Sequence, residues 1–298
     1  MRRAEALDRI RGALYGVAVG DALGGPLEFM SAETIQKKYG TVTEMIGGGW
    51  LDLRPGETTD DTAMTIAVAR GITENPKDPV PGIGARFIEW AQSKPKDIGM
   101  ACRGSIIQAY SYGGLKPTEE EWLLAAHAYQ RHVGRPVEGN GALMRTIYPA
   151  LYYTDRQERL DVTKRIAKMT HAGKVSAAIC QEYVELVHDA LTIGGANLTE
   201  TIGYKAGTEP TGYVIDSYSN ALEAIYDAGT FEEALIRAVN RGGDADTIGA
   251  IAGGLAGAIY GYKEIPDRWI ACLDESLKKE MDRLAAFALA NHPEYSEN

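Results

Sequence analysis

The stretch Gly12-Ala-Leu-Tyr-Gly16-Val-Ala-Val-Gly20-Asp-Ala-Leu-Gly24 carries a glycine at every fourth position, and Gly249-Ala-Ile-Ala-Gly253-Gly-Leu-Ala-Gly257-Ala-Ile-Tyr-Gly261 repeats this pattern. Residues four apart lie on one face of a helix, so each stretch predicts a helix with a stripe of glycines. A glycine inside a helix costs about 0.5–1 kcal/mol relative to alanine, and close packing of helix backbones offsets that cost. We therefore expect two buried, central helices that pack on each other and bring Asp21 and Asp246 together.

The rest of the chain has the periodicity of helices rather than the alternation of strands. Helices are predicted over residues 5–24, 60–73, 83–92, 100–112, 119–132, 141–153, 158–170, 173–191, 212–228, 231–240, 245–261 and 267–290. One short strand is predicted over residues 41–46. No connecting segment is long enough to be an interdomain linker. The pattern predicts a single all-α domain over residues 1–298.

Charge and composition exclude several classes of protein. The 298 residues carry a formal net charge of −10, which argues against non-specific binding to nucleic acid and to anionic membranes. The three cysteines form no CxxC pair, so they indicate buried or incidental thiols in a reducing compartment rather than disulfides. The charged N-terminus lacks the apolar core of a signal peptide, and we expect a cytoplasmic protein.

Two acidic clusters carry the chemistry. One is Thr58-Thr-Asp-Asp-Thr62 and the other is Gly242-Gly-Asp-Ala-Asp-Thr247, and each opens a predicted helix. Helix capping by Thr59 or Asp60 accounts for one acid in a cluster but not for two acids with threonines in both. Oxygen ligands suit hard divalent cations, whereas neither cluster holds the His or Cys typical of zinc. The clusters therefore indicate a site for two divalent ions with bridging carboxylates.

Four ordered motifs resemble the ADP-ribosylglycohydrolase family: Gly20-Asp-Ala-Leu-Gly24, Thr59-Asp-Asp-Thr-Ala-Met64, Asn140-Gly-Ala-Leu-Met-Arg145 and Gly242-Gly-Asp-Ala-Asp-Thr247. Two further stretches, Gly47-Gly-Gly-Trp50 and Lys96-Asp-Ile-Gly99, resemble the bacterial branch that activates dinitrogenase reductase. The resemblance runs from about residue 8 to residue 262. It implies an all-α, orthogonal multi-helix bundle with a centre of two Mg²⁺ or Mn²⁺ ions.

The resemblance also implies roles for particular residues. The metal ligands it implies are Thr59, Asp60, Asp61, Asp244, Asp246 and Thr247. Glu28 matches a family glutamate beside the metals, and Asp97 matches an acid proposed to act on the ribose in the bacterial branch. Either of them is a candidate for proton transfer. The substrate contacts it implies are Asn140, Gly141, His171 and Tyr213. Each of these has a plainer structural interpretation, such as a helix cap for Asp97 or a core hydrogen bond for His171. We interpret Asp21 as a structural acid that holds a helix end or the metal-site loops.

By this resemblance the chain is a metal-dependent hydrolase that removes ADP-ribose from modified protein, with arginine as the expected linkage and dinitrogenase reductase as a possible target. Other linkages stay open, namely serine or a small-molecule ADP-ribose compound. A non-catalytic relative that only binds its ligand is a further alternative. Such a relative should have lost metal-binding acids, whereas all four aspartates of the two clusters are present here.

Overall fold

The computed structural model describes residues 1–298 apart from 195–197, 199–200, 202, 293–294 and 296–298. Its regular structure is helical, which confirms the predicted all-α class. The α-helices are α1 (Arg3–Gly24), α2 (Ala32–Tyr39), α3 (Asp60–Glu74), α4 (Val80–Gln92), α5 (Met100–Gly113), α6 (Glu119–Val133), α7 (Tyr148–Tyr152), α8 (Arg156–Lys168), α9 (Lys174–Ile193), α10 (Val214–Ile225), α11 (Phe231–Val239), α12 (Ala245–Tyr260), α13 (Asp267–Cys272) and α14 (Glu275–Ala290). Three 3₁₀ turns are η1 (Gly25–Leu27), η2 (Leu143–Arg145) and η3 (Tyr262–Glu264).

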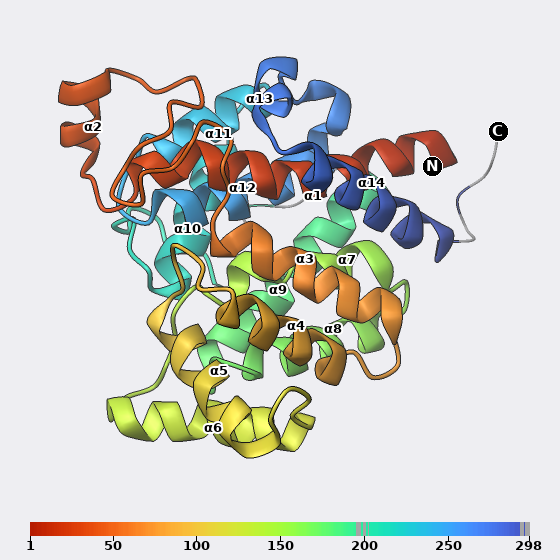
Figure 1. The fold of residues 1–298 in the computed structure, drawn as a ribbon. Coiled ribbons are helices and arrows are strands. Elements are labelled where there is room, and N and C mark those ends of the chain that lie inside the picture. Colours follow the sequence, from red (N-terminus) through yellow and green to blue (C-terminus); the bar gives the residue numbers. More distant parts are fainter. Residues whose placement is uncertain (195–197, 199–200, 202, 293–294, 296–298) are drawn as a thin grey trace.

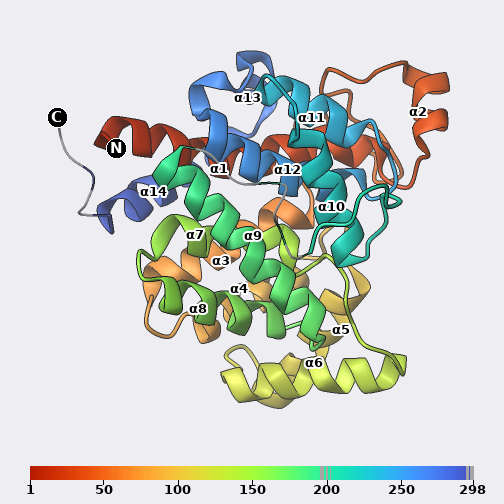
Figure 2. The same cartoon turned by 180° about the vertical axis from the view of Figure 1, so that it is seen from behind.

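Helices α1 and α12 lie side by side through the upper half of the molecule (Figures 1 and 2). They run antiparallel, so that Gly12 faces Gly257, Gly16 faces Gly253 and Gly20 faces Gly249. A Cβ added to Gly249 would lie 2.5 Å from the carbonyl oxygen of Gly20, which is well inside van der Waals contact. The predicted burial and pairing of the two glycine stripes are thus confirmed.

One end of the pairing differs from the prediction. Gly24 meets Ala245 rather than a fourth glycine of the second stripe. Gly261 lies just beyond the end of α12 with φ +90°, where it ends the helix instead of lining it. Because the last contact lies at Ala245, the carboxyl end of α1 adjoins the amino end of α12, where the acids are.

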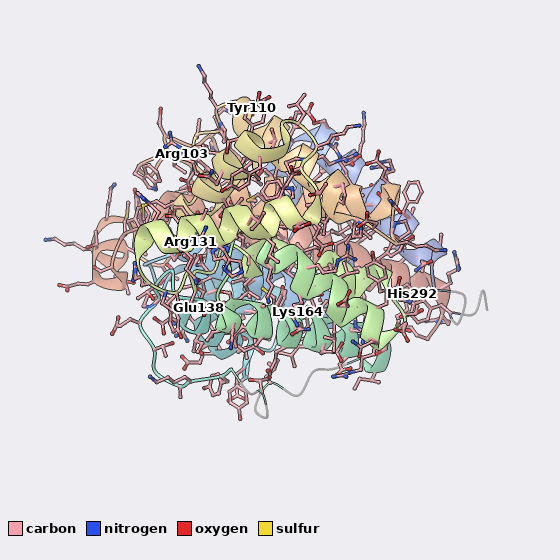
Figure 3. The ribbon with its side chains drawn as sticks, turned by 90° about the horizontal axis from the view of Figure 1, so that it is seen from below. Arg103, Tyr110, Arg131, Glu138, Lys164 and His292 are labelled. Carbon is pink, nitrogen blue, oxygen red and sulfur yellow. The ribbon has the colours of Figure 1, made fainter. Side chains whose placement is uncertain are left out.

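The other helices surround this pair. Helices α9, α10 and α11 pack against α12, whereas α14 packs against α1. Helices α3 to α9 form the lower half of the molecule, and α6 lies across the face seen from below (Figures 1 and 3). One buried apolar cluster joins residues from Ala6 to Tyr295. Helices of both halves therefore contribute to one buried core.

The predicted strand over residues 41–46 is wrong. The structure has no β-strand in its described residues, only isolated bridges such as Gly48 with Leu53. The backbone N–H and C=O of Val42 are instead bound by the side-chain amide of Asn240, at 2.8 and 2.9 Å. A side chain therefore satisfies the polar groups that a neighbouring strand would otherwise have to satisfy.

Two helix predictions also need correction, and one helix was missed. The segment predicted as one helix over 141–153 is divided into η2 and α7, with Pro149 in the first turn of α7. The helix predicted over 267–290 is broken at Leu273, after which the Asp274 side chain caps α14. Helix α2 was not predicted, because its single buried apolar residue is Ile35 and a Ser31 cap defines its start.

Among the described residues, we find no helix that combines the length and the apolar character needed to cross a lipid bilayer.

Candidate metal centre and active site

Asp21 anchors the first acidic cluster. Its buried carboxylate, near the end of α1, accepts hydrogen bonds from the backbone N–H groups of Thr59 and Thr62, at 3.0 Å. It also accepts from the two threonine hydroxyls, at 2.9 and 2.5 Å. Four donors on one carboxylate fix the amino end of α3 against α1, which is the structural role predicted for Asp21.

The second cluster meets the first from the opposite helix. Asp244 is the N-cap residue of α12, and Asp246 and Thr247 lie in its first turn. The Thr247 hydroxyl lies 3.4 Å from Oδ2 of Asp61, at the start of α3. The glycine pairing of α1 with α12 therefore brings the two acidic clusters together at the amino ends of α3 and α12.

A cavity of about 630 Å³ opens over these helix ends. Every predicted site residue lines it except Thr59 and Asp61, which are buried. Asp61 and Asp246 are almost fully buried, at 1% and 2% exposure. A volume of this size is typical of a small-molecule site. The residues predicted separately from four parts of the chain thus share one cavity.

The carboxyl groups of this cavity perturb one another. Burial raises the pKa of Glu28 to about 8, although a hydrogen bond from Trp50 opposes the shift. Burial, together with the charge of Asp97, raises the pKa of Asp60 to about 7. Burial likewise holds the pKa of Asp61 and Asp246 well above the usual range. Crowded carboxyl groups of this kind need either protons or cations to be stable.

The residues fit a divalent cation. One oxygen atom each from Glu28, Asp97 and Asp246 lies within 4.8 Å of the other two. Oδ1 of Asp61 is buried and has no hydrogen-bond partner among the described residues. Buried polar atoms are normally satisfied, so an orphaned carboxylate oxygen beside other carboxylates indicates a position for a cation. Glu28 and Asp97, predicted as catalytic acids, therefore also belong to a group that can hold a metal ion.

An aromatic pair that the sequence analysis did not assign to the site lies at the cavity mouth. Trp50 donates its indole N–H to Oε2 of Glu28, at 2.6 Å. Its ring centroid lies 5.5 Å from that of Phe29, and the two side chains are 54% and 70% exposed. The run Gly47-Gly-Gly-Trp50 was the only sequence signal for this pair, and it pointed to the segment rather than to a contact.

The predicted substrate loop is tied to the second acidic cluster. Asn140 donates from its side-chain amide to Oδ2 of Asp244 and to the Ser217 hydroxyl, both at 2.8 Å. Its backbone N–H binds the carbonyl of Gly212, and Gly139 bridges to Tyr213. Segments 138–141 and 212–214 therefore form one wall of the cavity.

The remaining predicted contacts also reach the cavity. Tyr213 is 41% exposed on this wall, and Gly141 lies beside the buried His171 ring. Asp97 does not cap α5, because Gly99 is the N-cap residue. Its Oδ1 instead accepts the backbone N–H of Ile98, at 2.8 Å. The helix-cap interpretation of Asp97 is therefore wrong, and its carboxyl group faces the same cavity as Glu28.

Comparison with known proteins agrees with this geometry. The family model described as ADP-ribosylglycohydrolase matches residues 2–207 and 196–297. The chain belongs to the ADP-ribosylglycohydrolase family. It is 34% identical to the ADP-ribosyl-[dinitrogen reductase] glycohydrolase of Rhodospirillum rubrum, over 95% of this chain and 96% of that one.

Two further family comparisons cover nearly the whole chain. The ADP-ribosylarginine hydrolase Tri1 of Pseudomonas putida (strain GB-1) is 29% identical, over 89% of this chain and 74% of that protein. A solved structure described as an ADP-ribosylglycohydrolase-related protein complex superimposes with a TM-score of 0.79 at 30% identity, and covers 97% of this chain and 99% of that one. As a member of this family the chain is a hydrolase, and its family chemistry is the removal of ADP-ribosyl groups from proteins.

Proposed function

We propose that this hydrolase cleaves the N-glycosidic bond between ADP-ribose and an arginine guanidinium on a modified protein, with two Mg²⁺ or Mn²⁺ ions. The observation that carries the proposal is the meeting of the two acidic clusters in one cavity beside Glu28 and Asp97. The metal ligands in this proposal are Thr59, Asp60, Asp61, Asp244, Asp246 and Thr247, with Glu28 and Asp97 adjoining them.

Bound divalent cations would supply Lewis-acid chemistry at the ribose hydroxyls and a more acidic water. The chain itself supplies orientation and proton transfer. Asn140, Gly141, His171 and Tyr213 line the wall on which the ADP-ribosyl group would lie. Proton transfer to the leaving guanidine is assigned to the pair Glu28 and Asp97, because a positioned carboxyl group is what general acid–base catalysis needs.

The preference for arginine is supported by the cavity mouth. Carboxyl groups of Glu28 and Asp97 lie beside the exposed rings of Phe29 and Trp50. A guanidinium forms charge-assisted hydrogen bonds with carboxylates and stacks on aromatic faces. A serine hydroxyl can neither pair with a carboxylate through two parallel hydrogen bonds nor stack on a ring. The relative from Pseudomonas putida, whose name specifies ADP-ribosylarginine, is consistent with this choice.

The expected target is an arginine-modified protein, and the name of the Rhodospirillum rubrum relative makes dinitrogenase reductase the first target to try. The test incubates the protein with arginine-, serine- and glutamate-linked ADP-ribose, each with Mg²⁺, with Mn²⁺ and with a chelator. Fastest release from arginine in the presence of metal supports the proposal. Full activity in the chelated sample contradicts the metal requirement, and faster release from serine contradicts the linkage.

A further inference from the structure

Arg145 is a buried cation without an acidic partner among the residues that the structure describes. It is 0% exposed, and none of the ion pairs between described residues includes it. Its guanidinium donates to the carbonyl of Gly141 and to the hydroxyl of Thr170, both at 2.8 Å. Its plane lies over the ring of Phe87, with 4.8 Å from Cζ to the ring centroid. Burying a charge is expensive, so a buried arginine bound only by neutral groups invites a functional explanation.

The hydrogen bond to Thr170 has a consequence for the next residue. Oγ1 of Thr170 lies 2.8 Å from Nδ1 of His171. Arg145 can only donate, so Oγ1 accepts from it and keeps its own single hydrogen for another acceptor. The other neighbour of Oγ1 is the sulfur of Cys102 at 4.0 Å, and sulfur is a weak acceptor. This arrangement favours a hydroxyl hydrogen directed to Nδ1 of His171, which would leave the hydrogen of the imidazole on Nε2.

Nε2 of His171 faces the loop that lines the cavity. It has no hydrogen-bond partner among the described residues, and His171 is one of the residues lining the cavity. A Cβ on Gly139 would lie 3.2 Å from Nε2, and a Cβ on Gly141 would lie 3.2 Å from Cε1. Because these two positions carry no side chain, none from them separates this edge of the ring from the cavity that it lines. Burial and the charge of Arg145 lower the pKa of His171 to about 3, so the ring stays neutral.

We propose that Arg145, acting through Thr170, is a positioning residue that fixes the Nε2–H tautomer of His171. His171 then donates a hydrogen bond to an acceptor oxygen of the bound ADP-ribosyl group. The identity of that ligand rests on the proposed function, whereas the tautomer is a property of the free protein. We call the hydrogen bonds from Arg145 to Thr170 and from Thr170 to His171 the relay. Without it the neutral ring would be divided between two tautomers, and one of them would turn a bare nitrogen to the ligand oxygen.

The tautomer is measured by NMR on protein labelled with ¹⁵N at its five histidines, with His171→Asn used to assign the signals. A protonated and a bare imidazole nitrogen resonate at well-separated ¹⁵N shifts. We expect a bare Nδ1 and a protonated Nε2 at His171 throughout the neutral pH range. A protonated Nδ1, or two averaged nitrogens, in the wild-type protein would overturn the proposal without any variant.

The relay itself is tested by Thr170→Val, which keeps the shape of the side chain and removes the hydroxyl. Both His171 nitrogens should then move toward averaged shifts, and Thr170→Ser should restore the wild-type spectrum. The matched control is Thr163→Val, since Thr163 is buried nearby in α8 and donates to the carbonyl of Arg159, at 2.7 Å. An unchanged His171 spectrum in Thr170→Val, or an equal change in Thr163→Val, contradicts the relay.

The ligand step is tested by titration with ADP-ribose. The Nε2–H signal should shift on binding, and Thr170→Val should raise the Kd by roughly tenfold, the effect of losing one good hydrogen bond. Binding that leaves Nε2–H unmoved contradicts the donor role of His171. If ADP-ribose does not bind at all, the proposed function is wrong, and the tautomer measured in the free protein still decides the relay.

Discussion

The side-chain amide of Asn140 donates a 2.8 Å hydrogen bond to Oδ2 of Asp244, a residue 104 positions later in the chain. This bond joins the wall on which the substrate would lie to the acid at the N-cap position of α12. A second-sphere donor of this kind orients a carboxylate, and such partners influence metal affinity. The proposed substrate wall and the proposed metal ligands are therefore joined by a direct hydrogen bond.

Removing one carboxylate charge should abolish metal binding while the fold survives. Asp60→Asn and Asp246→Asn keep the shape of the side chain but offer a neutral amide, which binds hard cations less well. We expect losses of metal affinity and turnover greater than the roughly 10–100-fold typical of second-sphere changes. Calorimetry with Mn²⁺ measures metal affinity, release of ADP-ribose measures turnover, and circular dichroism measures whether the fold survives.

The control is Asp52→Asn, since Asp52 is exposed and has a φ of +51° that asparagine tolerates. Both metal affinity and turnover should stay at the wild-type level in this variant. Metal binding that persists in Asp246→Asn would remove that residue from the ligand set.

The stability of the metal-free protein should fall as pH rises. Glu28 and Asp60 have pKa values raised to about 8 and about 7, so the folded state holds protons that the unfolded state releases. Their contribution to the free energy of unfolding is present below pH 4 to 5 and is lost as pH rises through 7 and 8. The slope reaches at most about 1.4 kcal/mol per pH unit for each group.

Thermal melts of chelated protein between pH 5 and pH 8.5 test this direction. Metal binding displaces the same protons, so the rise in Tm caused by Mg²⁺ should be largest at high pH. A chelated protein that is more stable at pH 8 than at pH 6 would contradict the raised pKa values.

Asp97 should matter for turnover more than for binding. Asp97→Ala and Asp97→Asn should each lower kcat on arginine-linked substrate by about 10²–10⁴-fold, the range of general acid–base catalysis. Metal affinity and ADP-ribose affinity should change little. The asparagine variant keeps an acceptor for the N–H of Ile98, so a defect confined to the alanine variant would indicate a loop-structuring role. Loss of metal binding in both variants would show that Asp97 is a ligand instead.

The aromatic pair should act on the protein substrate rather than on ADP-ribose. Phe29→Ala removes a ring that is 70% exposed at the cavity mouth, and a cation–π contact there is worth about 0.5–2 kcal/mol. We expect KM for arginine-linked substrate to rise about two- to thirtyfold with the Kd of free ADP-ribose unchanged. Phe287→Ala removes another exposed phenylalanine, on α14, and should leave both constants unaltered. Equal effects of the two variants would exclude a specific role for Phe29.

The glycine pairing predicts a large effect from one methyl group. Gly16→Ala would place Cβ against the backbone of Gly253, where no side chain can move aside, and should destabilise the protein by about 1–3 kcal/mol or more. Gly82→Ala in α4 is the matched helical control, because its nearest neighbour is the flexible carboxylate of Glu74 at 3.3 Å. Urea unfolding should show little change, or a slight gain, for the control. A neutral Gly16→Ala would refute the packing argument.

Much of the fold was predictable because its signals are local. Glycines four residues apart predicted the central pair, and two acids at each helix start predicted the clusters that meet there. The errors came from interactions between distant residues. Asn240 binds Val42 across 198 positions, which no pattern within residues 41–46 reveals. The contacts of Trp50 with Glu28 and of Arg145 with Thr170 span 22 and 25 positions, beyond the reach of a helical or strand pattern, so the aromatic pair and the histidine relay became visible only in the structure.

The antiparallel pairing of α1 with α12 also sets an order of events during synthesis. Gly12 and Gly257 are 245 positions apart, so the first helix leaves the ribosome long before the surface that covers it exists. At a synthesis rate of about 5–20 residues per second, roughly 12 to 49 seconds separate the synthesis of Gly12 from that of Gly257. Asp21 holds the start of α3 early, yet the second acidic cluster arrives only with α12. The growing chain therefore cannot assemble its full set of acids, and cannot become a competent hydrolase, until α12 has been made.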